Sequence, residues 1–137
     1  MKKRFAVYPI VAVSLASMSA APRATRQERG KYLVENVAMC GDCHTPHGPR
    51  GPAAGQWLAG ADLAFRPAVP MPVWAGRAPS LNPWPKGWTE ADMEALLTTG
   101  LRPNGQAARP PMPSYRMSKE DAAAITAYLK GLSRDHL

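Results

Sequence analysis

The stretch Cys40-Gly41-Asp42-Cys43-His44 places two thiols and an imidazole within about one turn of chain. The spacing Cys-x-x-Cys-His is typical of c-type haem attachment, in which both sulfurs form thioethers with the porphyrin and the histidine binds the iron. Attachment needs two nucleophilic sulfurs, and the imidazole that follows supplies a metal ligand. The stretch therefore predicts one covalently bound haem c, with Cys40 and Cys43 as attachment points and His44 as an iron ligand.

A Cys-x-x-Cys pair also occurs in redox dithiols and in zinc sites. A thioredoxin-like dithiol is expected within a βαβ pattern, and a structural zinc site needs a second pair of Cys or His ligands. The chain has two cysteines in total. His47 lies too close to the pair to reach an opposite face of a metal, and His136 lies near the C-terminus. The pattern therefore favours haem over both alternatives.

The first 21 residues predict an export signal. Residues 1–4 carry three basic side chains, and residues 5–21 form an apolar run of 17 that ends in small residues, as in a secretory signal peptide. An uncleaved membrane anchor is the alternative, although the run contains Pro9 and is short against the roughly 20 residues that span a bilayer. The expected location is the bacterial periplasm. If the signal is not cleaved, the protein is expected to be anchored to the inner membrane.

Residues 22–137 are expected to form one small domain. A chain of this size buries a modest core, and a bound macrocycle would add to its apolar centre. The formal charge of +7 falls to +4 once the three basic residues of the signal are excluded. The remaining Lys and Arg residues are scattered rather than clustered in a stripe, so we expect no nucleic-acid partner.

Three capping-box patterns predict helix starts, at residues 25–28, 89–92 and 118–121. The first helix is expected over 25–39, with Gly30 marking either a close approach of another backbone or the start of a shorter helix. Gly100 is the expected end of the second helix. The side chains predicted to be buried are Met93, Leu96 and Leu97 in the second helix and Ala122, Ile125, Leu129 and Leu132 in the third. Three helices joined by loops predict an all-α domain.

Residues 46–85 are rich in Pro and Gly and lack sustained periodicity, which predicts a long ordered loop. Irregular backbone of this kind suits the surface of a flat macrocycle. The aromatic residues that are candidates to line a haem, with an indole N–H to a propionate, are Trp57, Phe65, Trp74, Trp84 and Trp88. The basic candidates for propionate contact are Arg66, Arg77 and Arg102. The alternative for each is an ordinary core or surface role.

Met112 lies in the stretch Pro110-Pro111-Met112-Pro113. Prolines restrict their own backbone and that of the preceding residue to extended conformations, so the thioether is presented from a stiff loop. A weak bond from sulfur to iron needs that stiffness, and Met112 is therefore the predicted second axial ligand. The alternatives are that Met112 fills a gap in the core, or that the ligand is one of Met117, Met71, Met93 and Met39.

The stretches at 40–46 and 110–113, each next to a predicted helix, resemble class I cytochromes c, and the resemblance spans residues 25–133. Met112 follows His44 by 68 residues, similar to the separation of the axial ligands in that family. Shorter stretches resemble haem domains in the cytochrome subunits of membrane-bound alcohol and aldehyde dehydrogenases, and these are residues 57–60, 78–83, 87–89 and 97–100.

The resemblance implies a cytochrome c fold with three or more helices and long loops around one haem. It also implies that the first and last helices cross near Gly30 and Tyr128. A backbone carbonyl shortly after the anchor, near Pro46 or Pro49, is expected to hold the His44 ring.

The expected function is one-electron transfer with both axial ligands retained, so we expect an electron carrier rather than an enzyme. The expected partners are redox proteins, namely a dehydrogenase as donor and an oxidase or cytochrome as acceptor, docked through a small and short-lived contact. One alternative is a haem-containing subunit of a membrane-associated dehydrogenase or oxidase complex. Another is a gas sensor or peroxidase with an open sixth site, for which Arg109 is the candidate distal residue.

Overall fold

The computed structural model describes residues 24–134 and the side chains up to Leu132. The signal-peptide and anchor predictions, and His136, lie outside the described residues. The helices are α1 (Arg26–Tyr32), α2 (Cys40–His44), α3 (Glu90–Thr99) and α4 (Lys119–Arg134), and a π-helical turn, η1 (Leu33–Val37), continues α1. Two antiparallel ladders pair β1 (His47–Gly48) with β2 (Gly51–Pro52) and β3 (Ala61–Asp62) with β4 (Arg77–Ala78). Within the described residues, no helix is both long and apolar enough to cross a bilayer.

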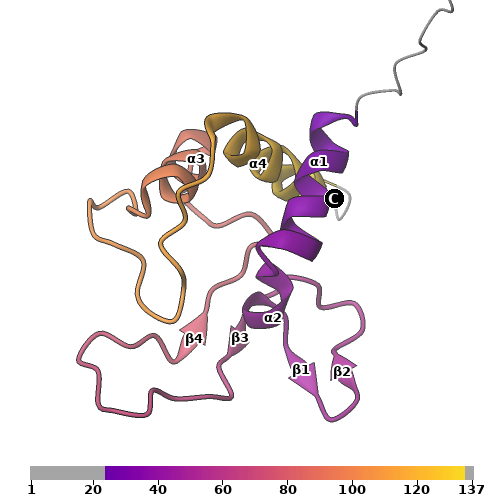
Figure 1. Ribbon diagram of the computed structural model, residues 1–137. Helices are drawn as coiled ribbons and strands as arrows, with labels where there is room; N and C mark the ends of the chain where they lie inside the picture. The colour runs from indigo at the N-terminus through magenta and orange to yellow at the C-terminus, as the bar shows by residue number, and fades with distance from the viewer. Residues whose placement is uncertain (1–23, 135–137) are drawn as a thin grey trace, which may run out of the picture.

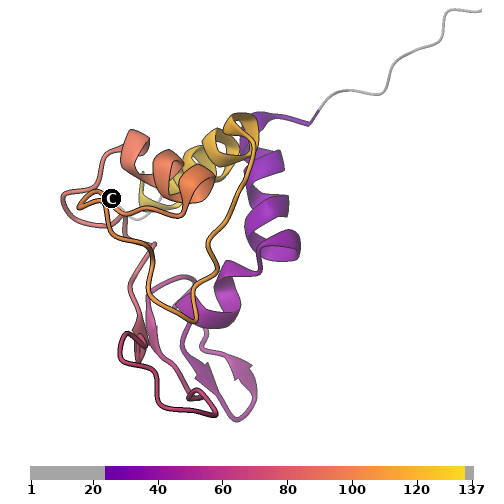
Figure 2. The same ribbon diagram turned by 60° about the vertical axis from the view of Figure 1, so that its left-hand side comes forward.

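Helices α1 and α4 pack against each other, as Figures 1 and 2 show from two sides. Their closest approach is at Gly30. A Cβ at Gly30 would overlap the carbonyl oxygen of Ala124 and lie 2.9 Å from the Cβ of Tyr128. The close approach predicted for Gly30, and its crossing near Tyr128, are therefore confirmed. The Tyr128 hydroxyl donates a hydrogen bond to Glu35 across the same interface, at 2.9 Å.

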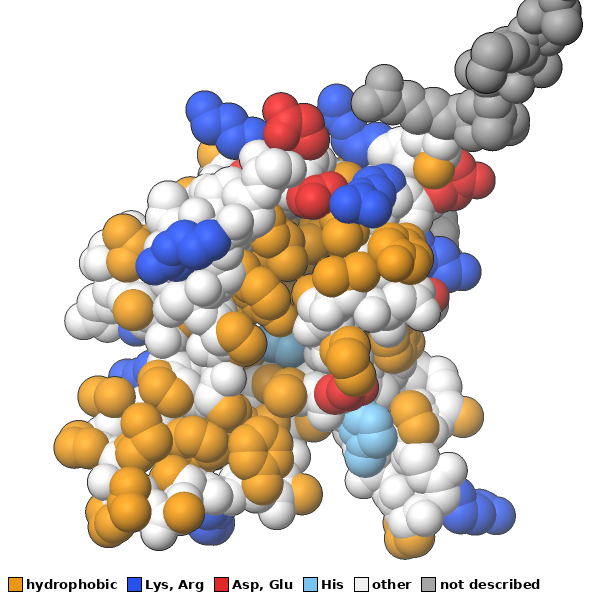
Figure 3. All heavy atoms as spheres, in the orientation of Figure 1, with side chains coloured by type: hydrophobic (Ala, Val, Ile, Leu, Met, Phe, Trp, Pro, Cys, Tyr) orange, Lys and Arg blue, Asp and Glu red, His pale blue; other side chains and the backbone are white. Residues whose placement is uncertain are grey.

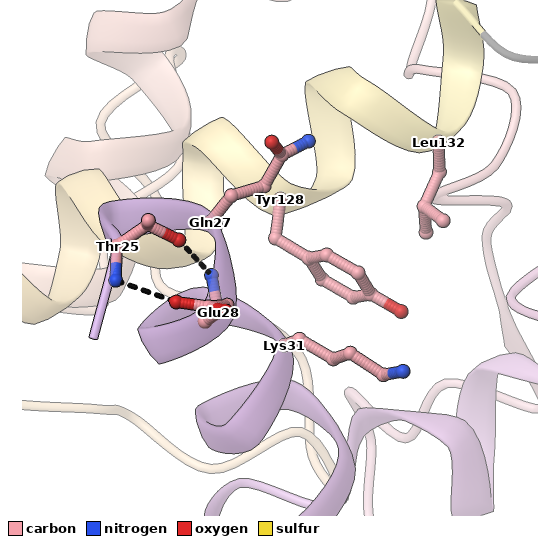
Figure 4. Close-up of a pocket in the computed structure, with 6 residues that line it drawn as sticks. All are labelled: Thr25, Gln27, Glu28, Lys31, Tyr128 and Leu132. Atoms are coloured by element: carbon pink, nitrogen blue, oxygen red, sulfur yellow. Dashed lines mark hydrogen bonds between the residues drawn. The ribbon is translucent and has the colours of Figure 1, made fainter.

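The predicted capping box begins α1. The Thr25 hydroxyl accepts from the Glu28 N–H at 3.2 Å, and the Glu28 carboxylate accepts from the Thr25 N–H at 2.7 Å. These two residues also line a pocket of about 270 Å³ at the α1–α4 crossing (Figure 4), together with Gln27, Lys31, Tyr128 and Leu132. The cap engages one oxygen of the Glu28 carboxylate at the edge of this pocket.

The first helix does not run unbroken over 25–39 as predicted. The Ala38 N–H donates to the Leu33 carbonyl at 2.7 Å, which is the wider i to i+5 spacing of a π turn. Met39 then adopts left-handed backbone, with φ of 50°, and α2 begins at Cys40. The carbonyl of Ala38 is satisfied by the Tyr115 hydroxyl at 2.9 Å, from 77 residues further along the chain. A long-range contact of this kind leaves no local signal in the sequence.

Helices α3 and α4 begin and pack as predicted. Thr89 and Asp92 form a reciprocal capping box, and Gly100 ends α3 with φ of 77°. The Ser118 hydroxyl accepts from the Asp121 N–H at 3.1 Å at the start of α4. The predicted faces are confirmed, since Met93, Leu96, Leu97, Ala122, Ile125 and Leu129 are buried and Leu132 packs against them. The domain is mostly helical, and the two short ladders are additions that the prediction did not include.

The predicted long loop is largely irregular, apart from its two ladders. The β3–β4 pairing closes the connection 63–76, which lies at the end of the molecule away from α4 (Figure 1). Hydrophobic side chains gather on the surface over this part of the fold (Figure 3). The large exposed ones from this connection are Phe65, Val69, Met71 and Val73.

Candidate haem-binding site

Helix α2 carries all three residues of the attachment motif. Cys40 and Cys43 are half-buried, and His44 is buried. The Trp57 ring fills the space beside Gly41, where a Cβ would overlap two of its ring carbons. This packing leaves no room for a side chain at Gly41, the first of the two positions between the cysteines. It also fixes α2 against the core.

His44 is held by one short hydrogen bond. Its Nδ1 lies 2.7 Å from the Pro79 carbonyl, and because a carbonyl only accepts, the ring proton lies on Nδ1. Burial lowers the pKa of His44, while the bond to Pro79 opposes that effect. The imidazole is therefore neutral at ordinary pH, with the lone pair of Nε2 available for a metal.

The carbonyl that holds the His44 ring is not near Pro46 or Pro49, so this expectation is wrong. The Pro46 carbonyl accepts instead from the Ala53 N–H at 2.8 Å. The chain leaves through β1 and β2 and returns 35 residues after His44, where the β3–β4 ladder brings Pro79 to the ring. Directly before β3, the Gly60 N–H donates to the His44 carbonyl at 2.7 Å.

The two thiols do not have the properties of a reactive dithiol. Burial raises the pKa of Cys40 to about 11, and burial together with the Asp42 charge raises the pKa of Cys43. Reactive Cys-x-x-Cys pairs need the opposite shift, towards the thiolate. Neither cysteine forms a disulfide.

A zinc site receives no support from the described part of the chain. No three His, Cys, Asp or Glu side chains come together there to hold a metal ion. The exposed His47 donates from Nδ1 to the Thr45 carbonyl at 2.7 Å, so its ring turns back on its own loop.

Met112 lies on a loop that passes beside the attachment motif. Its side chain is partly buried, and it packs against the same hydrophobic core as Cys40. The Tyr115 hydroxyl donates to Ala38, next to α2, and Figure 2 shows the connection after α3 running down to this helix. Burial is the main cause that raises the pKa of Tyr115 to about 12, and the charges of Cys40 and Cys43 add to it. The tyrosine is therefore close to both cysteines.

The other methionines occupy different environments. Met93 is buried in the core on α3, whereas Met39 and Met71 are exposed. Met117 is partly buried, and its N–H donates to the Leu97 carbonyl at 3.1 Å. Met112 and Met117 are thus the partly buried methionines of this loop, and the ligand role of Met112 stays a prediction.

Among the candidate propionate ligands, Trp74 stands out. Its indole N–H is buried without a hydrogen-bond partner in the described part of the chain, and its ring contacts Phe65 edge-on at 5.8 Å between centroids. The next residue, Ala75, donates to the Pro110 carbonyl at 2.8 Å, which ties Trp74 to the Met112 loop. A buried N–H needs an acceptor, and a carboxylate is a strong one.

Trp84, Arg77 and Arg102 have other hydrogen-bond or ion-pair partners, and Trp57 and Arg66 differ from them. The Trp57 N–H is also without a well-aligned hydrogen bond, but it has the Tyr128 hydroxyl as a polar neighbour. Trp84 donates to the Trp88 carbonyl at 2.9 Å. Arg77 pairs with Asp62 at 2.9 Å, and Arg102 donates to Gln106 at 2.7 Å. Arg66 is exposed, and so is Arg109, which was the candidate distal residue of an open sixth site.

These residues fit a covalently attached haem. Two adjacent thiols, a neutral imidazole with a free Nε2, a thioether on a braced loop and a buried unpaired N–H are the groups that such a cofactor uses. Sequence reasoning missed two residues that organise the site, Pro79 and Tyr115. Pro79 lies in the quoted stretch 78–83, and Tyr115 follows the proline-rich stretch, but neither position carried a signal for its role.

Comparison with known proteins agrees with this geometry. A family model described as Cytochrome c matches residues 27–133. A "Diheme cytochrome c-type" protein of Cereibacter sphaeroides is 35% identical over 78% of this chain and 36% of its own length. The fructose dehydrogenase cytochrome subunit of Gluconobacter japonicus is 32% identical over 76% of this chain and 21% of its own length. The cytochrome c subunit of the quinone alcohol dehydrogenase of Gluconobacter oxydans is 29% identical over 76% of this chain and 23% of its own length. The chain thus spans about a third or less of these relatives.

Proposed function

Because this chain belongs to the cytochrome c family, we propose that it is a periplasmic electron carrier in which Cys40 and Cys43 hold one haem c and His44 and Met112 bind its iron. The observation that carries the proposal is the orientation of His44. Its Nδ1 proton is committed to Pro79, which leaves Nε2 as the free donor atom of a buried, neutral ring.

When bound, haem supplies an iron that takes up and releases one electron. His44 contributes a nitrogen ligand whose orientation the Pro79 carbonyl maintains. Met112 contributes a neutral, soft sulfur, which favours the ferrous state and raises the reduction potential. Tyr115 braces the Met112 loop against the residues before α2, so the weak sulfur bond need not restrain a mobile segment by itself.

The ligand assignment is tested by the far-red absorption of the ferric protein, where methionine sulfur bound to Fe(III) gives a charge-transfer band. We expect the band in the parent and in Met117→Ala, and we expect it to be absent from Met112→Ala. Met117 is a matched control because it is a partly buried methionine of the same loop. A band that survives in Met112→Ala but not in Met117→Ala would transfer the role to Met117. Absence from all three proteins would contradict methionine ligation and favour a sensor or peroxidase.

The proposed periplasmic location is supported by the signal-peptide pattern of residues 1–21. The intact mass of the haem-loaded protein from the periplasmic fraction tests it. Loss of the first 19 to 21 residues indicates a cleaved signal. Recovery of the full-length chain in the membrane fraction indicates an anchor.

A second candidate function is that of a haem subunit in a dehydrogenase complex. It is favoured by the relatives from Gluconobacter, which are cytochrome subunits of dehydrogenases. Sedimentation of the native particle separates the two functions. A free carrier sediments with the mass of the single chain, whereas a subunit sediments with a dehydrogenase.

A further inference from the structure

We propose that the Thr45 hydroxyl is a positioning group that holds the Pro79 carbonyl on the His44 ring, and that it thereby helps to set the reduction potential. The inference rests on the proposed role of His44 as an axial ligand. Thr45 follows His44 directly, and 1% of its surface is exposed. Its own backbone N–H donates to the Gly41 carbonyl at 3.0 Å, so the residue is fixed at the end of α2.

The first link runs from Thr45 to Leu58. The Leu58 N–H donates to the Thr45 hydroxyl oxygen at 3.0 Å, in a buried environment. Leu58 is fully buried and has left-handed backbone, with φ of 59°. A residue with a branched side chain persists in that conformation only where its surroundings determine it. The hydrogen bond to Thr45 is one such determinant.

The second link runs from Leu58 to the segment that carries Pro79. The Leu58 carbonyl accepts from the N–H groups of Leu81 at 2.9 Å and Asn82 at 3.0 Å. Asn82 also donates through its side chain to the Trp57 carbonyl at 3.3 Å. The position of residues 79–82 is therefore set by the backbone around Leu58.

The third link closes the ring of contacts. Pro79 accepts from Nδ1 of His44 at 2.7 Å, and the His44 carbonyl accepts from the Gly60 N–H at 2.7 Å. Gly60 lies against the backbone of residues 78–80, where an added Cβ would be 2.7 Å from the Ser80 nitrogen. The acceptor of the His44 proton is thus tied back to His44 and Thr45 through residues 57–60.

The ring of contacts has a chemical consequence for the imidazole of His44. Donation from Nδ1 to a carbonyl raises the basicity of the imidazole and so favours the ferric state. If the Thr45 hydroxyl is removed, the buried Leu58 N–H loses its partner and the ring of contacts opens more often. The His44–Pro79 bond is then weakened, and the reduction potential is expected to rise.

The test compares Thr45→Val with Thr45→Ser in the haem-loaded protein. Valine keeps the shape and removes the acceptor, whereas serine keeps the hydroxyl. Thr89→Val is the matched control, because it removes another structural threonine hydroxyl, at the cap of α3. The readouts are the midpoint potential from spectroelectrochemistry and the exchange rate of the His44 Nδ1 proton from NMR.

We expect Thr45→Val to raise the potential and to speed Nδ1 proton exchange by about tenfold, as follows from an unpaired buried donor. Thr45→Ser and Thr89→Val are expected to keep the parental values. Unchanged values in Thr45→Val, equal shifts in Thr89→Val, or shifts in Thr45→Ser as large as in Thr45→Val would overturn the inference. If the parent lacks the shifted NMR signals of an iron-bound His44 ring, the proposed ligand role fails instead, so the two failures are distinguishable.

A measurement on the parent covers the case in which Thr45→Val does not fold. The ring of contacts predicts that the Leu58 N–H, the Leu81 N–H and the His44 Nδ1 proton exchange through one common opening, and so with similar protection. If the protection of the Leu58 and Leu81 N–H groups against hydrogen exchange differs by more than about tenfold, the two groups do not exchange through one common opening.

Discussion

Gly30 lies where the backbone of α4 occupies the space that a Cβ would need. The overlap is with the Ala124 carbonyl, which belongs to a helix and has little freedom to shift. The Arg29–Asp121 pair, at 3.0 Å, joins α1 to α4, and the Tyr128–Glu35 hydrogen bond joins α4 to η1, which continues α1. Both pairs depend on the short separation that Gly30 allows.

Gly30→Ala is therefore expected to reduce the free energy of unfolding by about 1–3 kcal/mol, because a methyl group forces the two helices apart. Denaturant unfolding of the haem-loaded protein measures the change. Gly48→Ala is the control, since an added Cβ there meets no atom within 4 Å. Equal stability of the two variants would contradict the crossing.

At the scale of elements, the Met112 loop and the end of η1 stabilise each other. The π turn leaves the Ala38 carbonyl without a helical partner, and Tyr115 supplies the donor at 2.9 Å. On its other side the loop accepts from Ala75 through the Pro110 carbonyl at 2.8 Å. The loop is thus held at both ends of its proline-rich stretch, and proline alone is not the source of its stiffness.

Tyr115→Phe removes only the hydroxyl and leaves the Ala38 carbonyl unpaired. We expect a loss of about 1 kcal/mol in the free energy of unfolding, the usual worth of one such bond. We also expect the far-red band proposed for Met112 ligation to disappear at a lower temperature than in the parent. Tyr32→Phe is the control because the Tyr32 ring is exposed. If the band disappears at the same temperature in Tyr115→Phe and Tyr32→Phe, the Tyr115–Ala38 hydrogen bond does not stabilise the Met112 loop.

At the scale of the whole molecule, two tyrosines couple folding to alkaline pH. Burial is the largest cause that raises the pKa of both Tyr115 and Tyr128 to about 12. Thioether formation removes the thiol charges that add to the shift at Tyr115, but it leaves the effect of burial. The folded state therefore favours the neutral hydroxyls, which donate to Ala38 and Glu35.

Because both pKa values are raised on folding, the stabilisation is complete below the ordinary tyrosine value near pH 10. It is lost as the pH rises towards about 12. Denaturant unfolding between pH 9 and about 12 is expected to show a steep fall in stability that Tyr115→Phe and Tyr128→Phe each reduce. A fall of the same steepness in the double variant would show that other groups cause it.

The parts of the fold that were predicted correctly depend on neighbours in the chain. The starts of α1, α3 and α4 follow from side chains that bond backbone groups three residues away, as Thr25, Thr89 and Ser118 do. The buried faces of α3 and α4 follow from helical periodicity. The wrong predictions concern contacts between residues far apart in the sequence. The helix break at Met39 and the acceptor for the His44 proton both depend on such distant residues.

The attachment motif, the helix starts and the family of the chain could all be predicted from the sequence, because they depend on residue types at short, regular spacings. The folded chain was needed to show that Pro79 orients His44, that Tyr115 braces the Met112 loop and that the Trp74 N–H is buried without a partner in the described part of the chain. Pro79 and Tyr115 lie 35 and 77 residues from their hydrogen-bond partners, and the Trp74 N–H has no partner among residues 24–134. Contacts over such separations depend on how the whole chain packs, and residue types alone do not encode them.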